Sequence, residues 1–400
     1  MDCLYSSLSQ YLISDIPKLV NGRKLKVLQV SRVYWPNLGG IEKIAQGLAE
    51  NLVNRGHVCD VVTLNRAFED GRDLEPYSKL NGVNIYRVPY RGSNRYPIAP
   101  SVHRFLSRYD IVHVHAVDFL ADWLVATQWL HKRPIVLSTH GGFFHTDYLI
   151  WAKKLWFNSV TKLTTSRVQR VLASSEHDYD LFSKISDNVE LARNAVELSD
   201  YREIQPAPIA GNFITVGRVD VHKGILDLLH ALSELKKIDD RPFRMRIIGP
   251  VVADGLEAEI EACIAQLGLT AEVKLEGRLE FDQLFDAVKT SELGLFPSTY
   301  EAFGISVVEA MGAGVVPVLN DIGAFRHFVS NGEDGFITDF SDKVKAAKSI
   351  KQARDLTKAK RRAMVKATRA RSTEYGWEAS VSRFEQLYSE VIGQWRSENG

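Results

Sequence analysis

EAFGISVVEA, residues 301–310, carries two carboxylates eight positions apart, Glu301 in a polar turn and Glu309 within an apolar run. We expect Gly304 to mark the junction between loop and helix, and Ser306 to cap the helix. The unpaired N–H groups and the positive dipole end of such a helix start attract phosphate. One carboxylate could then hold sugar hydroxyls and the other ribose hydroxyls. The alternative is that both are ordinary surface and cap residues.

The loop GRVDVHKG, residues 217–224, provides cations that suit a phosphate site. It follows an apolar run at 212–217, so we expect Arg218 and Lys223 on a loop at the carboxyl end of a strand. Arginine binds phosphate oxygens as a fork, and lysine binds them as a point charge. The two cations suit a diphosphate, although an ordinary solvated loop is the alternative.

Short apolar runs recur along the chain between helical stretches, as they do in sheets of buried parallel strands. The strands expected in the second half are 212–217, 243–249, 272–277, 293–296 and 315–320. Those expected in the first half are 25–31, 58–64, 83–88, 111–116, 134–139 and 170–175. The alternation predicts an α/β fold with doubly wound domains, which bind ligands beyond the carboxyl ends of their strands.

A glycine pair lies at one such strand end. The strand 25–31 runs into a loop that ends at Gly39 and Gly40, and an apolar helical stripe follows. Glycines at this junction let backbone N–H groups approach an anion. The pair is a weak motif, because a tight turn at the end of a strand is the alternative.

Three histidines lie on or beside expected strands. His140 directly follows the strand 134–139, so it should point into the ligand crevice. His113 and His115 lie inside the strand 111–116, where a histidine is more often packed than catalytic.

Length and composition indicate a soluble protein of two or three domains. Of its 400 residues, 45% are hydrophobic and 25% charged, and the net charge of +1 argues against a nucleic-acid binder. Two closely spaced prolines after residue 200 indicate a linker. We therefore expect a first domain at 1–200, with an extension at 1–22, and a second at 201–375. Residues 376–400 should form a helix that packs back on the first domain.

The cysteines Cys3, Cys59 and Cys263 are far apart and odd in number, which is typical of a reducing compartment. The first twenty residues do not resemble a signal peptide, and no window is apolar for long enough to span a bilayer. These features predict a cytoplasmic protein and leave attachment to a membrane surface open.

Together the motifs resemble the retaining GT-B glycosyltransferases of family 4, in which two Rossmann-like domains face a central cleft. The similarity covers nearly the whole chain. Its most specific element is the glutamate pair followed by AMGAGVVPV, and GRVDVHKG and STHGG match two further elements. The sequence departs from the family in RNAVEL, residues 193–198, where Ala195 replaces a customary glycine.

The resemblance implies a role for each motif. Glu301 would bind hydroxyls of the donor sugar, and Glu309 would bind the ribose. Arg218 and Lys223 would hold the diphosphate, and His140 would lie by the sugar. Catalysis would thus depend on His140, Arg218, Lys223 and Glu301. The remaining donor-binding positions would be Gly39, Gly40, Phe303, Gly304 and Ile305.

A narrower similarity concerns donor and acceptor. Residues 90–102 and 136–146 resemble the exopolysaccharide mannosyltransferases of this family, which transfer α-mannose from GDP-mannose to an oligosaccharide on polyprenyl diphosphate. Arg91, Arg95 and Tyr96 would meet the acceptor diphosphate. The alternatives are a transferase for UDP-glucose or UDP-galactose, a nucleotide-sugar epimerase, and an inactive sugar-nucleotide-binding module.

We expect front-face displacement, in which the leaving diphosphate accepts the acceptor proton and no carboxylate attacks the sugar. No metal or other cofactor is expected. The Asp-x-Asp pair Asp178 and Asp180 falls at a helix start, where acidic residues are favoured in any case.

A lipid-linked acceptor implies contact with a membrane surface, at the inner face of the cell membrane. The segment 151–170 mixes aromatic and basic residues as an interfacial helix does, and core packing with a solvated basic edge is the alternative. The basic residues between Lys358 and Arg371 are interpreted as one solvated helix face rather than as a partner site.

Overall fold

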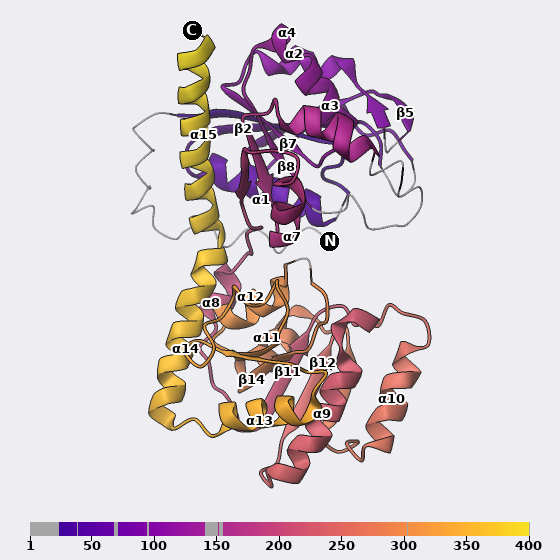
Figure 1. The fold of residues 1–400 in the computed structure, drawn as a ribbon, viewed down its shortest axis with the longest axis vertical. Helices are drawn as coiled ribbons and strands as arrows, with labels where there is room; N and C mark the ends of the chain where they lie inside the picture. The colour runs from indigo at the N-terminus through magenta and orange to yellow at the C-terminus, as the bar shows by residue number, and fades with distance from the viewer. Residues whose placement is uncertain are drawn as a thin grey trace. The chain divides into compact units, whose positions relative to one another are not determined.

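The chain forms two compact units (Figure 1). The computed structural model describes residues 24–37, 39–67, 71–93, 96–140, 151, 155–301 and 303–399. The first unit comprises the chain up to Leu172, residues 181–190 and the last segment from Val381, and the second comprises residues 173–180 and 191–380. The extension expected at 1–22 lies outside the described residues.

The first unit is built on an eight-stranded sheet in the order β10-β9-β8-β7-β1-β2-β4-β3. Its strands are β1 (Lys26–Ser31), β2 (Val58–Leu64), β3 (Tyr77–Leu80), β4 (Val83–Val88), β7 (Ile111–His115), β8 (Ile135–Ser138), β9 (Arg170–Ala173) and β10 (Val189–Leu191). The central pairs are parallel, and only the edge pair β3–β4 is antiparallel among the registers described. A separate hairpin joins β5 (Arg91–Ser93) and β6 (Tyr96–Ile98).

Helices along this part of the chain are α1 (Gly40–Asn54), η2 (Pro100–Val102), α2 (His103–Leu106), α3 (Phe119–Ala126), α4 (Gln128–His131), η3 (Phe157–Thr161), α6 (Lys162–Thr165) and α7 (Glu176–Phe182). The last helix, α15 (Trp377–Asn399), contributes to the first unit from Val381 onward. Within that unit the buried Glu385 accepts hydrogen bonds from Arg55 and His57, at 2.9 Å each. The Tyr388 hydroxyl lies 2.7 Å from His113 Nδ1, so α15 is tied to the sheet by polar as well as apolar contacts.

The second unit contains a six-stranded parallel sheet in the order β13-β12-β11-β14-β15-β16. Its strands are β11 (Asn212–Val216), β12 (Arg244–Ile248), β13 (Val273–Gly277), β14 (Leu293–Phe296), β15 (Val316–Asn320) and β16 (Phe336–Thr338). Its helices are α8 (Ser199–Glu203), η4 (Val221–Lys223), α9 (Ile225–Ile238), α10 (Leu256–Gln266), α11 (Phe281–Lys289), α12 (Ile305–Gly312), α13 (Lys343–Arg354), α14 (Lys358–Ser372) and η5 (Thr373–Tyr375).

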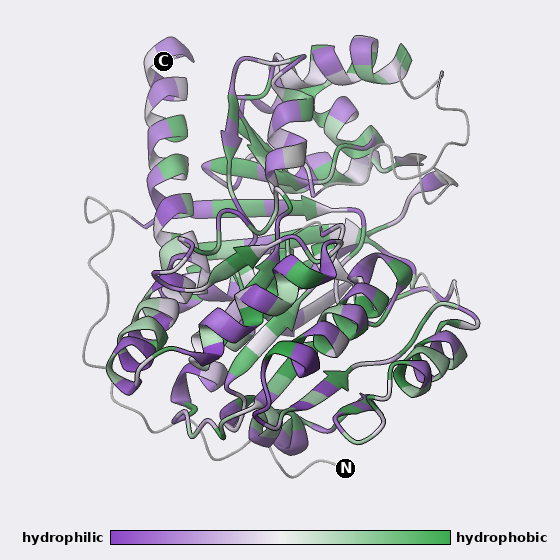
Figure 2. Ribbon diagram, turned by 60° about the horizontal axis from the view of Figure 1, so that its bottom comes forward, coloured by the Kyte–Doolittle hydropathy of each residue, from purple (hydrophilic) through white to green (hydrophobic). Residues whose placement is uncertain are grey.

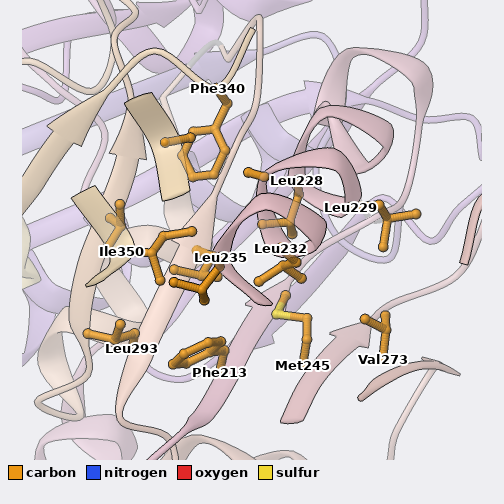
Figure 3. Packing of buried hydrophobic residues seen from close by; sticks show 14 of the residues in the cluster. Phe213, Leu228, Leu229, Leu232, Leu235, Met245, Val273, Leu293, Phe340 and Ile350 are labelled. Carbon is orange, nitrogen blue, oxygen red and sulfur yellow. The ribbon is translucent and has the colours of Figure 1, made fainter. Parts of the chain in front are cut away.

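The core of the second unit shows why these residues form these elements. Leu228, Leu232 and Leu235 are spaced four and three residues apart along α9, so they lie on one face of the helix. They pack onto Phe213 and Met245 of the sheet (Figure 3). Each buried leucine contributes about 2 kcal/mol of transfer free energy. In Figure 2 the strands are mostly hydrophobic and the helices are banded, as expected of a sheet covered on both faces.

The order of the strands sets the place of the site in each unit. In the first sheet β1 lies between β2 and β7, and in the second β11 lies between β12 and β14. The chain therefore reverses its direction of travel across the sheet at β1–β7 and at β11–β14. Loops at the carboxyl ends of such strands diverge to opposite faces and leave a crevice, which is where open α/β sheets bind ligands.

Every strand expected from the sequence is present, with small differences at the ends, which confirms the α/β fold of doubly wound domains. Strands β3, β5, β6, β10 and β16 were not expected. They are short, and β3, β10 and β16 lie at sheet edges, where no long buried apolar run is needed.

The segment after residue 190 packs on the second unit. Leu198 and Ile204 are buried in its core, and Ala207 N–H donates to the Lys289 carbonyl oxygen at 2.9 Å.

Among the helices that the structure describes, none is both long and apolar enough to cross a membrane.

Candidate functional site

The motif residues of the second unit gather at its switch point. Arg218 and Lys223 follow β11, and Glu301 follows β14, its neighbour in the sheet. A pocket between the two loops is lined by Gly217, Arg218, Lys223, Ser298, Glu301 and Ser306 among others. Residues 78 positions apart in sequence therefore meet, because the carboxyl ends of β11 and β14 share one edge of the sheet.

Lys223 and Glu301 form an ion pair in which both side chains are mostly buried. The same carboxylate oxygen, Glu301 Oε1, accepts a hydrogen bond of 3.0 Å from the Ser298 hydroxyl. Asn320 at the end of β15 donates to the Ser298 carbonyl oxygen at 3.0 Å and accepts from Phe340 N–H at 3.0 Å. The Glu301 carboxylate is thus held by two side chains, one of which is itself anchored to the sheet.

The turn that carries Lys223 is fixed against the loop after β14. Gly224 has φ +66, and a Cβ there would lie 2.3 Å from the Pro297 carbonyl oxygen, so only glycine fits. Thr299 N–H donates to the His222 carbonyl oxygen at 2.8 Å, and the Asp220 carboxylate caps η4 at its first N–H. Lys223 consequently has little freedom in its backbone.

The start of α12 differs in one respect from expectation. Gly304 is the N-cap residue with φ +101, which confirms the junction, and a Cβ there would lie 2.8 Å from the Phe325 ring. Ser306 is not the cap, so that prediction is wrong: the helix begins at Ile305, one residue before it, and no side chain caps it among the described residues. Ser306 instead lines the pocket, while Phe303 is buried and Ile305 is exposed.

Glu309 lies one turn into α12. The Tyr201 hydroxyl of α8 hydrogen-bonds its carboxylate, and burial and the Glu309 charge together raise the pKa of Tyr201. Tyr201 gave no signal in the sequence, because the contact depends on how α8 packs against α12.

Arg218 is exposed and forms no ion pair with any described residue. Its guanidinium is therefore available to an anion at the mouth of the pocket. Lys223 is engaged by Glu301, so the two cations of the motif have different environments.

In the first unit, Gly39 is the N-cap of α1 and Gly40 is its first residue. Gly39 has φ −152, an extended conformation that any residue adopts, so the tight turn considered from the sequence is not what requires glycine. A Cβ on Gly39 would lie 2.2 Å from the Glu42 carboxylate, whereas no described atom lies within 4 Å of a Cβ on Gly40. A side chain would therefore fit at Gly40 but would meet the Glu42 carboxylate at Gly39.

His140 follows β8 with φ +53, a left-handed conformation that is uncommon outside glycine. Its Nε2 lies 2.9 Å from Nδ1 of His115, and the two rings stack with centroids 5.1 Å apart. His113 is fully buried, with Ser138 and Tyr388 each 2.7 Å from a ring nitrogen, and burial lowers its pKa to about 3. His113 is thus a packed histidine, whereas His115 contacts a predicted site residue.

The residues expected at the acceptor lie on the β5–β6 hairpin. Arg91 is exposed on β5, and its backbone pairs with Ile98. Arg95 and the side chain of Tyr96 lie outside the described residues.

Asp178 and Asp180 lie in α7, as expected of a helix start. The Asp178 carboxylate accepts from the Ser174 hydroxyl at 3.0 Å, and Ser175 accepts from Asp178 N–H at 3.2 Å. Asp178 is buried in these local contacts.

The basic run of α14 is not one solvated face. Arg361 pairs with Glu292 at 2.8 Å, and Arg371 pairs with Asp334 at 3.0 Å. Arg369 donates to the Ile204 carbonyl oxygen at 3.0 Å. The expectation is therefore wrong for these three arginines, which attach α14 to its own unit.

Ala195, which stands where the family has a customary glycine, is buried and is not among the residues with positive φ.

Two protein-family models match the chain: Glycosyltransferase Family 4 over residues 38–200 and Glycosyl transferases group 1 over residues 208–371. The GDP-mannose:cellobiosyl-diphosphopolyprenol alpha-mannosyltransferase of Xanthomonas campestris is 34% identical over 94% of this chain and 99% of its own. The protein of the same name from Komagataeibacter xylinus is 30% identical over 92% of this chain and 94% of its own.

Solved structures share the fold. A glycosyltransferase from Rickettsia africae superposes with a TM-score of 0.69 at 19% identity, over 92% of this chain and 99% of that one. HepE of Anabaena in complex with UDP has a TM-score of 0.69 at 17% identity, over 92% and 100%. Both have the GT-B fold of two Rossmann-like domains.

Proposed function

The chain belongs to the family 4 glycosyltransferases, and from this we propose that it transfers α-mannose from GDP-mannose to an oligosaccharide carried on polyprenyl diphosphate. Relatives that are 30–35% identical over nearly their whole length carry names that state this donor and such an acceptor. The observation that carries the proposal is the Lys223–Glu301 pair in the pocket at the switch point of the second unit.

Glu301 would bind hydroxyls of the mannose. An ionised carboxylate accepts hydrogen bonds only, and Ser298 and Lys223 already direct Oε1. Oε2 is then available to accept from a sugar hydroxyl. Glu309, held by Tyr201, would accept from the ribose in the same way.

Lys223, Arg218 and the N–H groups at the start of α12 would stabilise the departing diphosphate. The glycosidic C–O bond to the diphosphate breaks as the acceptor oxygen bonds to the same carbon on the same face. GDP leaves with the electron pair, and its phosphate oxygen accepts the proton of the acceptor hydroxyl. Donors aimed at the developing charge are usually the largest single catalytic contribution, about 3 kcal/mol for one group.

We propose that neither a metal nor another cofactor is required. The two cations and the helix start offer positive charge where a diphosphate site would otherwise use a divalent ion. Of the Asp-x-Asp pair, Asp178 is engaged by Ser174 and Ser175 at the start of α7.

The acceptor requires the protein to work at a membrane surface, and we propose peripheral attachment at the cytoplasmic face. The helical segment around η3 and α6 exposes large apolar side chains, with Leu155 65% and Leu163 51% exposed. Lys162 and Arg167 are exposed on the same segment. Exposed apolar residues beside cations suit a bilayer with anionic lipids.

A donor panel tests the proposal. Purified protein is incubated with a lipid extract that contains polyprenyl-diphosphate oligosaccharides, and with radiolabelled GDP-mannose, UDP-glucose or UDP-galactose. We expect label in the lipid fraction only from GDP-mannose, with an α-linked product and no loss of rate in EDTA. Transfer from a UDP sugar alone would overturn the donor, and abolition by EDTA would overturn the metal-independent mechanism.

A further inference from the structure

A buried polar chain runs behind His140 in the first unit. It begins at Gln29 of β1, passes through His115 at the end of β7 and reaches His140 after β8. Gln29 and His115 are almost fully buried. The Gln29 amide lies 3.0 Å from His115 Nε2, and His115 Nδ1 lies 2.9 Å from His140 Nε2.

The backbone of α1 selects the orientation of the Gln29 amide. With its nitrogen toward His115, the amide donates to His115 Nε2 at 3.0 Å and to the Ala45 carbonyl oxygen at 2.9 Å, and it accepts from Ala49 N–H at 3.2 Å. The reverse orientation faces the amide oxygen toward the Ala45 oxygen and the amide nitrogen toward Ala49 N–H. Both contacts are then repulsive, so the first orientation is favoured.

This orientation determines where the proton of His115 resides. Burial, together with the neighbouring His113 and His140, holds the pKa of His115 well below its usual range, so the ring is neutral. Nε2 accepts from Gln29, and the single N–H of the ring is therefore at Nδ1. His113 does not compete for this ring, because its two nitrogens face Tyr388 and Ser138.

We propose that Gln29 and His115 are positioning residues that set the tautomer of His140. His115 Nδ1–H donates to His140 Nε2, which leaves the neutral His140 ring with its proton on Nδ1. His140 Nδ1 is then an N–H donor and not an acceptor, which would suit an oxygen of a sugar ligand at the carboxyl end of β8. This last step rests on the proposed function.

Nitrogen NMR of the full-length protein tests the proposal without any substrate. Imidazole nitrogens are labelled with ¹⁵N, and the His140 signals are identified by their loss in His140→Gln. We expect the shifts of a ring protonated at Nδ1. A wild-type His140 protonated at Nε2 would overturn the proposal, whichever sugar the enzyme transfers.

A matched pair of variants tests the part of His115. His115→Asn offers an amide donor near the position of Nδ1, whereas the isosteric His115→Asp offers an acceptor. We expect His115→Asn to keep the His140 proton on Nδ1 and His115→Asp to move it to Nε2. We expect kcat to fall at least tenfold further in His115→Asp than in His115→Asn. An identical His140 tautomer in both variants would show that His115 does not set it.

If His140 has the expected tautomer but the protein does not transfer mannose from GDP-mannose, the inference about the tautomer holds and only the proposed donor is wrong. Should either variant fail to fold, the wild-type measurement alone decides between the two tautomers.

Discussion

At the scale of single residues, the Lys223–Glu301 pair is better explained by a ligand than by stability. Two charges that leave water for a mostly buried site gain little net free energy from each other. Removal of one partner nevertheless leaves the other charge buried and unpaired, which lowers the free energy of unfolding by about 3 kcal/mol. A pair that adds little stability but is supported by Ser298 and Asn320 is what we expect if the proposed diphosphate-sugar site is correct.

Replacing Lys223 should therefore reduce turnover more than binding. We expect Lys223→Ala to lower kcat on the order of 10²–10³-fold, because the leaving diphosphate loses one fixed donor. Steady-state kinetics with GDP-mannose measures this. Lys236→Ala is the control, since its ammonium pairs with Glu272 at 2.6 Å, outside the pocket lining. Near-normal turnover in Lys223→Ala would remove Lys223 from the mechanism.

Gly304 should be required for stability because of its surroundings as well as its φ. Alanine there would adopt φ +101 and approach the Phe325 and Phe328 rings to 2.8 and 3.0 Å. Gly332 has φ +85 with no described atom within 4 Å of a Cβ. We expect Gly332→Ala to destabilise by about 1 kcal/mol and Gly304→Ala by about 3 kcal/mol, measured by chemical unfolding. Equal losses of stability in the two variants would mean that the Phe325 and Phe328 rings move to make room for the alanine side chain.

At the scale of elements, a carboxylate caps the start of α3. Asp118 caps α3 by accepting from Leu120 N–H at 2.9 Å and Ala121 N–H at 3.3 Å. Its other oxygen, Oδ2, is buried without a partner among the described residues, although the residue as a whole is half-buried. Burial raises the pKa of Asp118 to about 6, against hydrogen bonds and Arg32 that act to lower it.

The folded protein consequently binds the Asp118 proton more tightly than the unfolded chain does. The stability from this group is fully present below the unfolded pKa near 4 and is lost as the pH rises through about 6. Asp118→Asn keeps a cap but cannot ionise. We expect the stability of the variant relative to the wild type to rise by about 2 kcal/mol between pH 4.5 and 7.5, measured by urea unfolding. A constant difference between the two proteins across this range would contradict the assignment.

The segment around η3 and α6 should mediate attachment to membranes. We expect Leu155→Ser/Leu163→Ser to lower the fraction of protein that floats with anionic vesicles at least tenfold. Each substitution removes roughly one to two kcal/mol of the free energy gained when the leucine side chain enters the bilayer. The matched control is Ile209→Ser/Val252→Ser, which removes two exposed apolar residues from the second unit. Equal flotation of both variants would reject this segment as the anchor.

At the scale of the whole molecule, one topological rule places the motifs in both units. In each sheet the chain starts at a middle strand, moves out to one side, and then crosses to the neighbour on the other side of that first strand. Loops distant in sequence therefore meet at one edge. In the first unit this edge holds Gly39, Gly40 and His140, and in the second it holds Arg218, Lys223 and Glu301. Each unit thus gathers its own predicted site residues at one edge of its sheet.

The sequence by itself determined the fold class, the family and the residues that follow β8, β11 and β14, because buried parallel strands and glycine-containing loops leave local patterns. Short edge strands such as β3 leave none. The tertiary structure alone decided that Lys223 meets Glu301 and that Tyr201 meets Glu309. It also decided that two arginines of α14 are ion-paired and that a third donates to a backbone carbonyl oxygen. It also brought Gln29 and His115 behind His140. These contacts join residues far apart in sequence, and their partners depend on strand order and helix packing, which no local pattern encodes.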